Sequence, residues 1–410
     1  MPVKKKVIFN DPIYGFIHSP NKIVLDLIEN PYFQRLRRIK QLGLTHLVYP
    51  GAYHTRFQHA MGAMHLMTQA IEVLKSKGVL ISEEEATAVT IAILLHDIGH
   101  GPFSHALENS IVHNVTHEDI SELFMQRLND HHGGSLDLAI KVFKNRYKRK
   151  FFHQLVSGQL DIDRLDYLKR DSFFSGVAEG VISSDRIIKM LNVHKGQLVV
   201  DAKGIYSVEK FLIARRLMYW QVYLHKTVIA AEFLLIKILM RAKYLAQRKE
   251  VLFGTPALLF FLNNKVDKNA FSANSNVLDT FSNLDDYDIF SAIKVWADND
   301  DNVLSRLCKS LVDRDLFKVE IQENPFSAKH IASIKQKVQS HYQLKANELS
   351  YFVFTDSIKN SAYQIGENKI SILNKNGTVM DVAKASDHLN LTVLSKTVTK
   401  HVLCYPKSLC

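Results

Sequence analysis

Cysteine is scarce in this chain. Only three cysteines occur in 410 residues, at Cys308, Cys404 and Cys410. All three lie late in the sequence, and none has the spacing of a metal-binding thiolate pair. The count argues against a disulfide framework and fits a reducing compartment. It also argues against a structural zinc site built from thiolates.

Long apolar runs are missing as well. No run approaches the roughly 18 residues that a membrane-spanning helix needs. The most apolar region, residues 211–240, is interrupted by Arg215, Arg216, His225, Lys226, Glu232 and Lys237. The opening MPVKKKVIF lacks the apolar core of a secretory signal peptide. We therefore expect a cytoplasmic protein that does not enter a membrane.

The overall composition is that of an ordinary globular protein, with 47% hydrophobic and 23% charged residues. A length of 410 residues suggests two or three domains. The net charge of +11 implies attraction to polyanions such as nucleotides, nucleic acid or anionic membrane. The densest basic run, residues 141–150, fits either a solvated face or a contact for a polyanion or a regulatory nucleotide.

Helical patterns dominate the first 250 residues. His59, Ala63, Leu66, Ala70 and Val73 share one face of a predicted helix over residues 56–75. Ser82 and Glu85 form a capping-box pattern that predicts the start of a second helix, whose apolar face leads to His96. Asp161 is a predicted N-cap for a helix that begins at Ile162. Further helices are expected over residues 21–42 with a break near Pro31, 116–128, 136–158, and from Ser207 onward.

Strand patterns are short in the first part of the chain and concentrate near its end. Small hairpins are expected at residues 7–18 and 196–204. From Val251 the composition shifts, and strand-like runs occur at residues 351–354, 370–373, 391–394 and 401–404. The sequence thus predicts a mainly α fold, with a helical domain over residues 1–250. A smaller mixed α+β region over residues 251–410 would cap or oligomerise it.

Histidine is concentrated in one part of the sequence. Eight of the 19 histidines lie between His54 and His117. His96 and Asp97 arrive together at the end of an apolar helix face, and burying such an ionisable pair is costly unless a cation compensates. A lone His-Asp pair would instead suggest a core histidine whose hydrogen bonds are made to neighbouring residues. The surrounding density of histidine favours a site.

Three predicted helices could bring ligands together. His59 lies on the first, His96 and Asp97 end the second, and Asp163 opens the third. Two imidazoles and two carboxylates suit one divalent ion such as Mn, Fe, Ni, Co or Mg, with positions left for water and substrate. Such an ion could polarise a phosphoryl oxygen or activate water.

Six segments, taken in order, resemble one family. They are DPIYG from Asp11, FQRLRRIKQLG from Phe33, HTRFQH from His54, HDIGHGPFSH from His96, THE from Thr116 and DIDRLDY from Asp161. Together they resemble the HD-domain phosphohydrolases, specifically the deoxynucleoside triphosphate triphosphohydrolase branch. The resemblance covers roughly residues 8–245, and it implies an HD-type metal-dependent domain over residues 1–250.

The resemblance also implies a role for individual residues. The metal ligands would be His59, His96, Asp97 and Asp163. His117 would be the general acid, oriented by Glu108, with His100 and His105 beside the α-phosphate. The resemblance places Arg56, Arg164 and Arg215 at phosphate-binding positions, Tyr167 and Asp171 at the deoxyribose, and Gln41 and Leu42 in the sugar-recognition turn; Tyr223, on the helix face of Arg215, joins the substrate-binding candidates. Whether His100, His105 and His117 hold a second ion is left open.

Several alternatives accompany these assignments. Arg56 could be a surface charge, Arg215 a partner for a buried carboxylate, and Tyr167 and Tyr223 core aromatics. Where a relative has polar base-side residues this chain has Tyr219 and Leu224, and it matches regulatory nucleotide positions only partly, with Glu29, Gln34 and Arg37. His100 stands where the cyclic-dinucleotide phosphodiesterases have lysine, which argues against that chemistry.

The expected activity is hydrolysis of a dNTP to deoxynucleoside and inorganic triphosphate. One alternative keeps the site and changes the substrate, giving a nucleotidase or phosphodiesterase for monophosphates or short oligonucleotides. Another is a nucleotide-binding or nucleic-acid-binding regulator with a vestigial site. The resemblance also implies a homodimer or homotetramer, with an open question about a regulatory nucleotide and about weak nucleic-acid binding.

Overall fold

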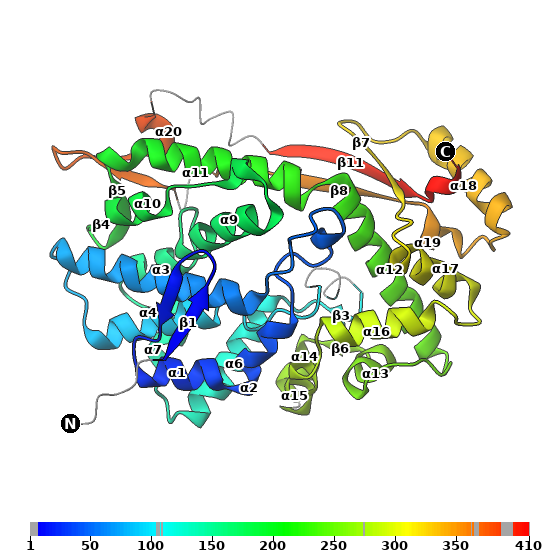
Figure 1. Ribbon diagram of the computed structural model, residues 1–410, viewed down its shortest axis with the longest axis horizontal. Helices are drawn as coiled ribbons and strands as arrows, with labels where there is room; N and C mark the ends of the chain where they lie inside the picture. The colour runs from blue at the N-terminus through cyan, green and yellow to red at the C-terminus, as the bar shows by residue number, and fades with distance from the viewer. Residues whose placement is uncertain are drawn as a thin grey trace.

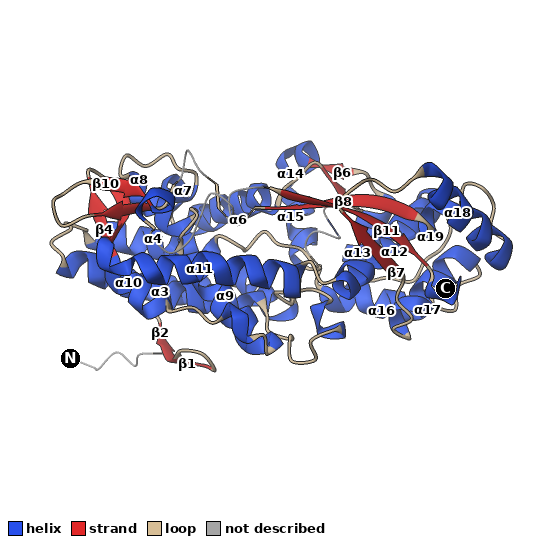
Figure 2. Ribbon diagram, turned by 90° about the horizontal axis from the view of Figure 1, so that it is seen from above, coloured by secondary structure: helices blue, strands red, loops and turns tan. Residues whose placement is uncertain are grey.

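The computed structural model describes residues 7–103, 107, 110–273, 275–361, 363–364, 369–386 and 397–409. Figure 2 shows an elongated molecule with two small sheets set apart along its length. Helices make up most of it, so the predicted mainly α fold with a mixed C-terminal region is confirmed. Among the described residues, no helix combines the length and the apolar character needed to cross a membrane.

The first part of the chain supplies the helices around the site (Figure 1). In order, its elements are β1 (Ile8–Asp11), β2 (Gly15–His18), α1 (Lys22–Glu29), α2 (Pro31–Gln34), the 3-10 helices η1 (Arg35–Arg38) and η2 (Thr45–Leu47), α3 (Arg56–Ser76), α4 (Glu83–Leu95), β3 (Val112–His113), α6 (His117–His131), α7 (Asp137–Phe143), α8 (Lys150–Val156) and α9 (Ile162–Ser175). The expected hairpin at residues 7–18 is confirmed by the antiparallel pairing of β1 with β2.

The two helices predicted from caps, α4 and α9, begin directly after Ser82 and Asp161. Thr55 and Ser82 each form a complete capping box, at α3 and α4. Asp161 caps α9, which ends at Gly176 in the left-handed conformation. Because α3 packs against both α4 and α9, these three helices form the frame of the N-terminal part.

Two helical predictions in this part are wrong in detail. The helix expected to resume through Leu42 becomes η1 and ends at Arg38, because residues 39–41 pair in extended form with residues 54–56. The helix expected over residues 136–158 is broken into α7 and α8, with Asn145 at a φ of 54° between them. The basic run lies in this break, where Arg149 and Lys144 pair with carboxylates of α4 and α6.

The middle of the chain is a long helical layer with one interruption. Its elements are the 3-10 helix η3 (Ala178–Gly180), α10 (Ser184–Met190), β4 (Leu191–His194), β5 (Gln197–Asp201), the 3-10 helix η4 (Ala202–Gly204), α11 (Ile205–Met218), the π-helical turn η5 (Tyr219–Tyr223) and α12 (Lys226–Gln247). The hairpin expected near residues 196–204 is confirmed as β4–β5. The long buried helix expected from Ser207 is interrupted at η5, where the hydroxyl of Tyr49 donates to the carbonyl of Gln221.

The last part contains helices and the strands of the mixed region. Its elements are α13 (Pro256–Asn263), β6 (Val266–Asp267), α14 (Lys268–Ala273), α15 (Ser275–Ser282), α16 (Asp286–Trp296), α17 (Asn302–Val312), β7 (Lys318–Gln322), α18 (Ala328–Tyr342), α19 (Leu349–Phe352), β8 (Phe354–Asn360), β9 (Ser371–Leu373), β10 (Val379–Asp381), α20 (Val382–Ala385), β11 (Val398–Tyr405) and the 3-10 helix η6 (Lys407–Leu409). The runs at 370–373 and 401–404 are strands as predicted. In the run at 351–354, Tyr351 and Phe352 end the helix α19 and Phe354 begins the strand β8. The run at 391–394 lies outside the described residues.

The two parts of the chain share sheets and core. One sheet has the order β10-β9-β5-β4 and another the order β7-β11-β8. The parallel pairs β5–β9 and β3–β6 both join strands from opposite sides of residue 250. The larger cluster of buried apolar side chains runs from Ile17 to Tyr405. The C-terminal region is therefore built into the same core as the helices of the site.

Candidate active site

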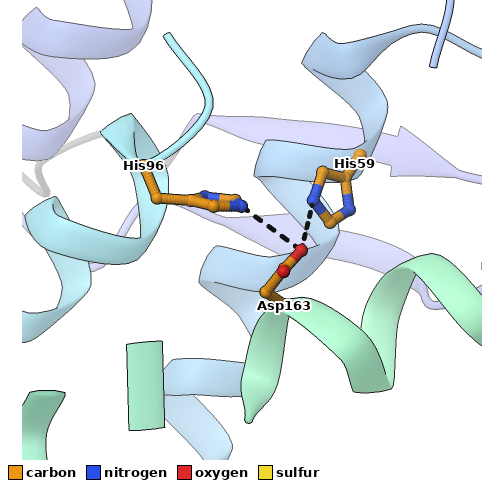
Figure 3. Close-up of side chains that lie close together, drawn as sticks. All are labelled: His59, His96 and Asp163. Atoms are coloured by element: carbon orange, nitrogen blue, oxygen red, sulfur yellow. Dashed lines mark ion pairs between the residues drawn. The ribbon is translucent and has the colours of Figure 1, made fainter. Parts of the chain in front are cut away.

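Three side chains from three helices meet at one point (Figure 3). His59 comes from the first turns of α3, His96 caps the end of α4, and Asp163 lies in the first turn of α9. The Nε2 atoms of His59 and His96 lie 3.0 Å and 3.3 Å from the same oxygen, Oδ1 of Asp163. Asp97 joins the group, with its Oδ1 atom 3.3 Å from Nε2 of His96. All four predicted metal ligands thus lie together.

The two imidazoles are oriented as a cation would require. Nδ1 of His59 donates to Oδ2 of Asp166 over 2.7 Å, and Nδ1 of His96 donates to the carbonyl of Ile93 over 2.6 Å. These contacts place the ring proton on Nδ1 and leave a lone pair on each Nε2. Both Nε2 atoms are buried, and neither makes a hydrogen bond of acceptable geometry to a described residue. The donor set therefore fits a divalent ion.

The pKa shifts of His59 and Asp163 also indicate that this group favours a positive charge. Burial alone would lower the pKa of His59, but the adjacent carboxylates of Asp163 and Asp166 raise that pKa to about 10. Burial likewise opposes ionisation of Asp163, yet His59 and His96 hold the pKa of this carboxyl far below its usual value. Protons and a divalent cation would compete for the same nitrogen atoms.

A buried ionic chain supports His59 from behind. Asp166 accepts from Nε of Arg170 at 2.9 Å, and Nη1 of Arg170 donates to Asp11 at 2.8 Å. Gly62 makes this approach possible, because a Cβ atom there would lie 2.1 Å from Oδ1 of Asp166. The sequence analysis assigned no role to Asp166. Its spacing of three residues from Asp163 on one helix was the available signal.

A second group of ligand-type side chains adjoins the first. Nε2 of His100 lies 3.3 Å from Oδ1 of Asp97, and the rings of His100 and His117 stack with centroids 3.8 Å apart. One potential ligand atom from each of Asp97, His100 and His117 lies within 4.8 Å of the others. Burial and the charge of Arg56 lower the pKa of His100 to about 3, so this imidazole is neutral.

His117 has a carboxylate neighbour that was not predicted. Oε1 of Glu118 lies 3.3 Å from Nε2 of His117. The residues expected to orient His117 and to flank the phosphate, Glu108 and His105, lie outside the described residues. The segment Thr116–Glu118 was one of the motifs that carried the resemblance, but no role was predicted for Glu118.

Ser121 ties the His96–His100 loop to α6. Its hydroxyl donates to the carbonyl of His96 over 2.8 Å and accepts from the backbone N–H of Gly99 over 2.9 Å. A Cβ atom at Gly99 would lie 2.2 Å from the carbonyl oxygen of His117. The close approach of these two backbones therefore requires glycine, and it sets His100 against His117.

A cavity of about 430 Å³ opens over both groups. The predicted residues that line it are Gln41, Leu42, Arg56, His96, Asp97, His100, His117, Asp163, Arg164, Tyr167, Asp171 and Tyr223. Glu118, Phe143, Val156, Ser157 and Tyr219 complete the lining. His59 is fully buried behind the wall, and Arg215 is not among the described residues of the lining.

The basic residues occupy different parts of the site. Nη1 of Arg56 donates to Oδ2 of Asp97 over 2.6 Å, and Arg56 is only 6% exposed. The alternative of a surface charge is therefore wrong for Arg56. Arg164 pairs with Asp161, and the guanidinium of Arg215 lies 5.9 Å from the ring centroid of Tyr219.

Asp171 is held by two neighbours at the other end of the cavity. Nε2 of His54 lies 2.8 Å from its Oδ1 atom, and the hydroxyl of Tyr223 donates to its Oδ2 atom over 2.7 Å. Burial and the charge of Asp171 raise the pKa of Tyr223, which stays a neutral donor. Tyr223 is thus a polar part of the lining and not solely a core aromatic. His54 was quoted in a motif but assigned no role.

Family models match two adjoining segments of the chain. The HD domain model matches residues 56–170, and the model of the HD associated region matches residues 182–247. The first match begins at Arg56 and contains all four predicted metal ligands. The second covers the layer from α10 to α12 that closes the cavity with Tyr219 and Tyr223.

Whole-chain similarities extend beyond these segments. The uncharacterized protein YwfO of Bacillus subtilis is 31% identical over 99% of this chain and 94% of its own length. The crystal structure of a phosphohydrolase from Bacteroides thetaiotaomicron is 51% identical, with a TM-score of 0.95, over 98% of this chain and 100% of that one. A relative from Dictyostelium discoideum, with the name deoxynucleoside triphosphate triphosphohydrolase SAMHD1 homolog, is 33% identical over 57% of this chain and 48% of its own length.

Proposed function

The chain belongs to the HD-domain phosphohydrolase superfamily, and from this membership we propose that it hydrolyses deoxynucleoside triphosphates to deoxynucleoside and inorganic triphosphate. The observation that carries the proposal is the cavity in which the His59–His96–Asp163 group, two arginines and three tyrosines occur together. The name of the Dictyostelium relative, a deoxynucleoside triphosphate triphosphohydrolase homolog, supports the choice of substrate.

We propose that His59, His96, Asp97 and Asp163 hold one divalent ion. When bound, the ion supplies Lewis-acid polarisation of a phosphoryl oxygen and of a water molecule. Asp166 and the carbonyl of Ile93 keep both imidazoles in the tautomer that offers Nε2. Whether Asp97, His100 and His117 hold a second ion is decided by the metal content of the purified protein.

The remaining polar side chains divide between the phosphates and the leaving group. Arg56, Arg164 and Arg215 neutralise the triphosphate, and guanidinium forks suit its oxygens. The water oxygen bonds to the α-phosphorus as the bond from phosphorus to the 5′-oxygen breaks. His117 gives its proton to that 5′-oxygen, and the water's proton leaves to solvent. Glu118 lies where it can hold the His117 imidazole for this transfer.

The sugar end of the substrate is recognised by a mostly neutral surface. Tyr167 packs on the deoxyribose, and Asp171 accepts from its 3′-hydroxyl while Tyr223 and His54 fix the carboxylate. Gln41 and Leu42 close the same side, and Oε1 of Gln41 is buried without a hydrogen-bond partner among the described residues. That oxygen is thus available to accept from a substrate hydroxyl.

The proposal is tested with the double variant His96→Ala/Asp97→Ala. The metal-loaded wild type should release inorganic triphosphate from dNTPs, and the variant should release none while keeping its helical circular dichroism. The matched control is Asp130→Ala/His131→Ala, an exposed Asp-His pair at the end of α6, which should retain full activity. Triphosphate release by the site variant contradicts the proposal. A wild type that releases no triphosphate from dNTPs but releases orthophosphate from a deoxynucleoside monophosphate, or cleaves a short oligonucleotide, is instead a nucleotidase or phosphodiesterase.

A further inference from the structure

The N-terminus of α16 lies against two loops of the site, although Asp286 follows Lys40 by 246 residues and Phe103 by 183 residues in the sequence. Asp286, the first residue of α16, is buried, with a side chain only 4% exposed. Its Oδ2 atom accepts from the backbone N–H of Lys40 over 2.9 Å. Its Oδ1 atom accepts from the backbone N–H of Phe103 over 3.3 Å. One carboxylate thus joins residues 40 and 103.

Arg35 adds a second link of the same kind. Its Nη2 atom donates to the carbonyl of Ile98 over 2.7 Å, and its Nη1 atom lies 3.4 Å from the carbonyl oxygen of Leu284. Arg35 is fully buried. The segment 284–286 is therefore connected to the loop 96–103 on one side and to residues 35–40 on the other.

Each of the two loops contributes residues to the lining of the cavity. Gln41 and Leu42 follow directly after Lys40, and the N–H of Gln41 donates to the carbonyl of His54. His96, Asp97 and His100 belong to the other loop, within the segment 96–103. Phe103 has a φ of 50°, a conformation that non-glycine residues rarely adopt without support. The carboxylate of Asp286 supplies a hydrogen bond to this residue.

We propose that Asp286 is a positioning residue of the active site, which sets the substrate-side turn 40–42 in register with the loop 96–103. The inference rests on the proposed function for its kinetic readout only. It gives the region after residue 250 a part in the chemistry, because a shift of about 1 Å between reacting groups can lower a rate about 100-fold. Asp286 does not line the cavity, so it acts through the two loops.

We call the two hydrogen bonds that Asp286 accepts from the N–H groups of Lys40 and Phe103 the clamp. The position of the proposed metal ligands should not depend on it. His59, His96 and Asp163 are fixed by α3, α4 and α9 and by the contacts of Asp166 and Ile93. Asp97 directly follows His96 in the loop and is held by Arg56 of α3. Loss of the Asp286 carboxylate should therefore change substrate alignment far more than ion affinity.

The test compares Asp286→Asn with Asp288→Asn. Asp288 completes the capping box of α16 by accepting from the N–H of Asp285, so its variant weakens the same helix and leaves the clamp intact. For Asp286→Asn we expect kcat to fall 10- to 100-fold and Mn²⁺ affinity to stay within about threefold. Hydrogen exchange should accelerate in peptides that cover residues 38–44 and 98–103. Asp288→Asn should keep kcat within about twofold at a similar loss of Tm.

Equal kcat values for the two variants, or exchange unchanged in either peptide, overturn the inference. If Asp286→Asn does not fold, hydrogen exchange of the wild type still tests the inference. The amides of Lys40 and Phe103 should both be protected from exchange although they lie in loops. Rapid exchange of either amide overturns the inference. The exchange data need no substrate. A wild type that does not hydrolyse dNTPs therefore contradicts the proposed function without touching this inference, and kcat is then measured on the phosphoester that it does cleave.

Discussion

Gly62 lies one turn beyond His59 on α3, directly against the carboxylate that orients this imidazole. A Cβ atom there would lie 2.1 Å from Oδ1 of Asp166 and 2.2 Å from Nη2 of Arg170. Alanine favours an α-helix over glycine by about 1 kcal/mol. Alanine at position 62 would therefore be favoured by helix propensity and opposed by its steric contacts with Asp166 and Arg170. We expect the steric disturbance of the buried ionic chain to be the larger effect.

We expect Gly62→Ala to lower the affinity for Mn²⁺ roughly 10- to 100-fold, because Asp166 can no longer hold His59 in place. Isothermal titration calorimetry on the metal-depleted protein measures it. The control is Ala63→Gly, which changes the propensity of α3 without adding an atom near Asp166, and it should bind Mn²⁺ within about threefold of wild type. An undiminished affinity in Gly62→Ala would show that His59 does not depend on Asp166.

Single residues were predictable from the sequence where a motif or a helical spacing carried them. His59, His96, Asp97 and Asp163 are of this kind, and the structure brings them together. Asp166 was missed although its helical spacing from Asp163 was a signal, and Ser121 and Asp286 were not found. Their contacts join residues far apart in the chain, and their own neighbours in sequence give no sign of the partner. Such contacts arise from packing, which local patterns do not encode.

At the scale of elements, Glu85 shows how α4 is held in place to deliver His96 and Asp97. Its side chain accepts from the N–H of Ser82, the hydroxyl of Tyr147 and the guanidinium of Arg149. Burial opposes ionisation, but these donors lower the pKa of Glu85 below its usual value. A carboxyl whose pKa is lowered by folding stabilises the protein above its unfolded pKa, and this stabilisation is lost as the pH falls through the folded pKa.

Glu85→Gln should therefore lower the free energy of unfolding by about 1–2 kcal/mol at pH 7. The difference from wild type should begin to shrink as the pH falls below about 4.5, where the carboxyl becomes protonated in the unfolded state, and it should be lost below the folded pKa, where both states are protonated. Urea unfolding at pH 7 and pH 4 measures both values. Glu84→Gln, an exposed residue of the same first turn, should change stability by less than about 0.5 kcal/mol. A pH-independent difference for Glu85→Gln would rule out the carboxylate as its source.

Elements with a cap and a continuous apolar face were predictable, as α3, α4 and α9 show. The interruptions were not. The π-helical turn η5 and the break between α7 and α8 contain no glycine or proline that would mark them in the sequence. Tertiary contacts at Gln221 and Arg149 accompany these breaks. Helix propensity is a weak prior where such contacts compete.

At the scale of the whole molecule, the division at residue 250 stays a prediction about domains. Composition alone suggested it, yet β5 pairs with β9 across it and α12 packs against both α17 and β7. Removing the C-terminal region would expose the edge of β5. It would also expose the apolar side of α12, which belongs to the larger core.

A fragment of residues 1–250 should therefore fail to fold cooperatively. Size-exclusion chromatography and thermal melting followed by circular dichroism should show aggregation or a broad transition, in contrast to one sharp transition for the full chain. A monodisperse fragment with a sharp transition would instead establish residues 1–250 as an independent domain.

The central claim is that this HD-domain protein cleaves a dNTP between the α-phosphorus and the 5′-oxygen at the His59–His96–Asp97–Asp163 group. The most direct measurement is phosphorus NMR of the products formed by the Mn²⁺-loaded wild type from a dNTP in ¹⁸O-labelled water. The account predicts one phosphorus product, inorganic triphosphate, with the label on its terminal phosphorus, and an unlabelled deoxynucleoside. Pyrophosphate or orthophosphate as the product, or the label in the deoxynucleoside, would contradict it.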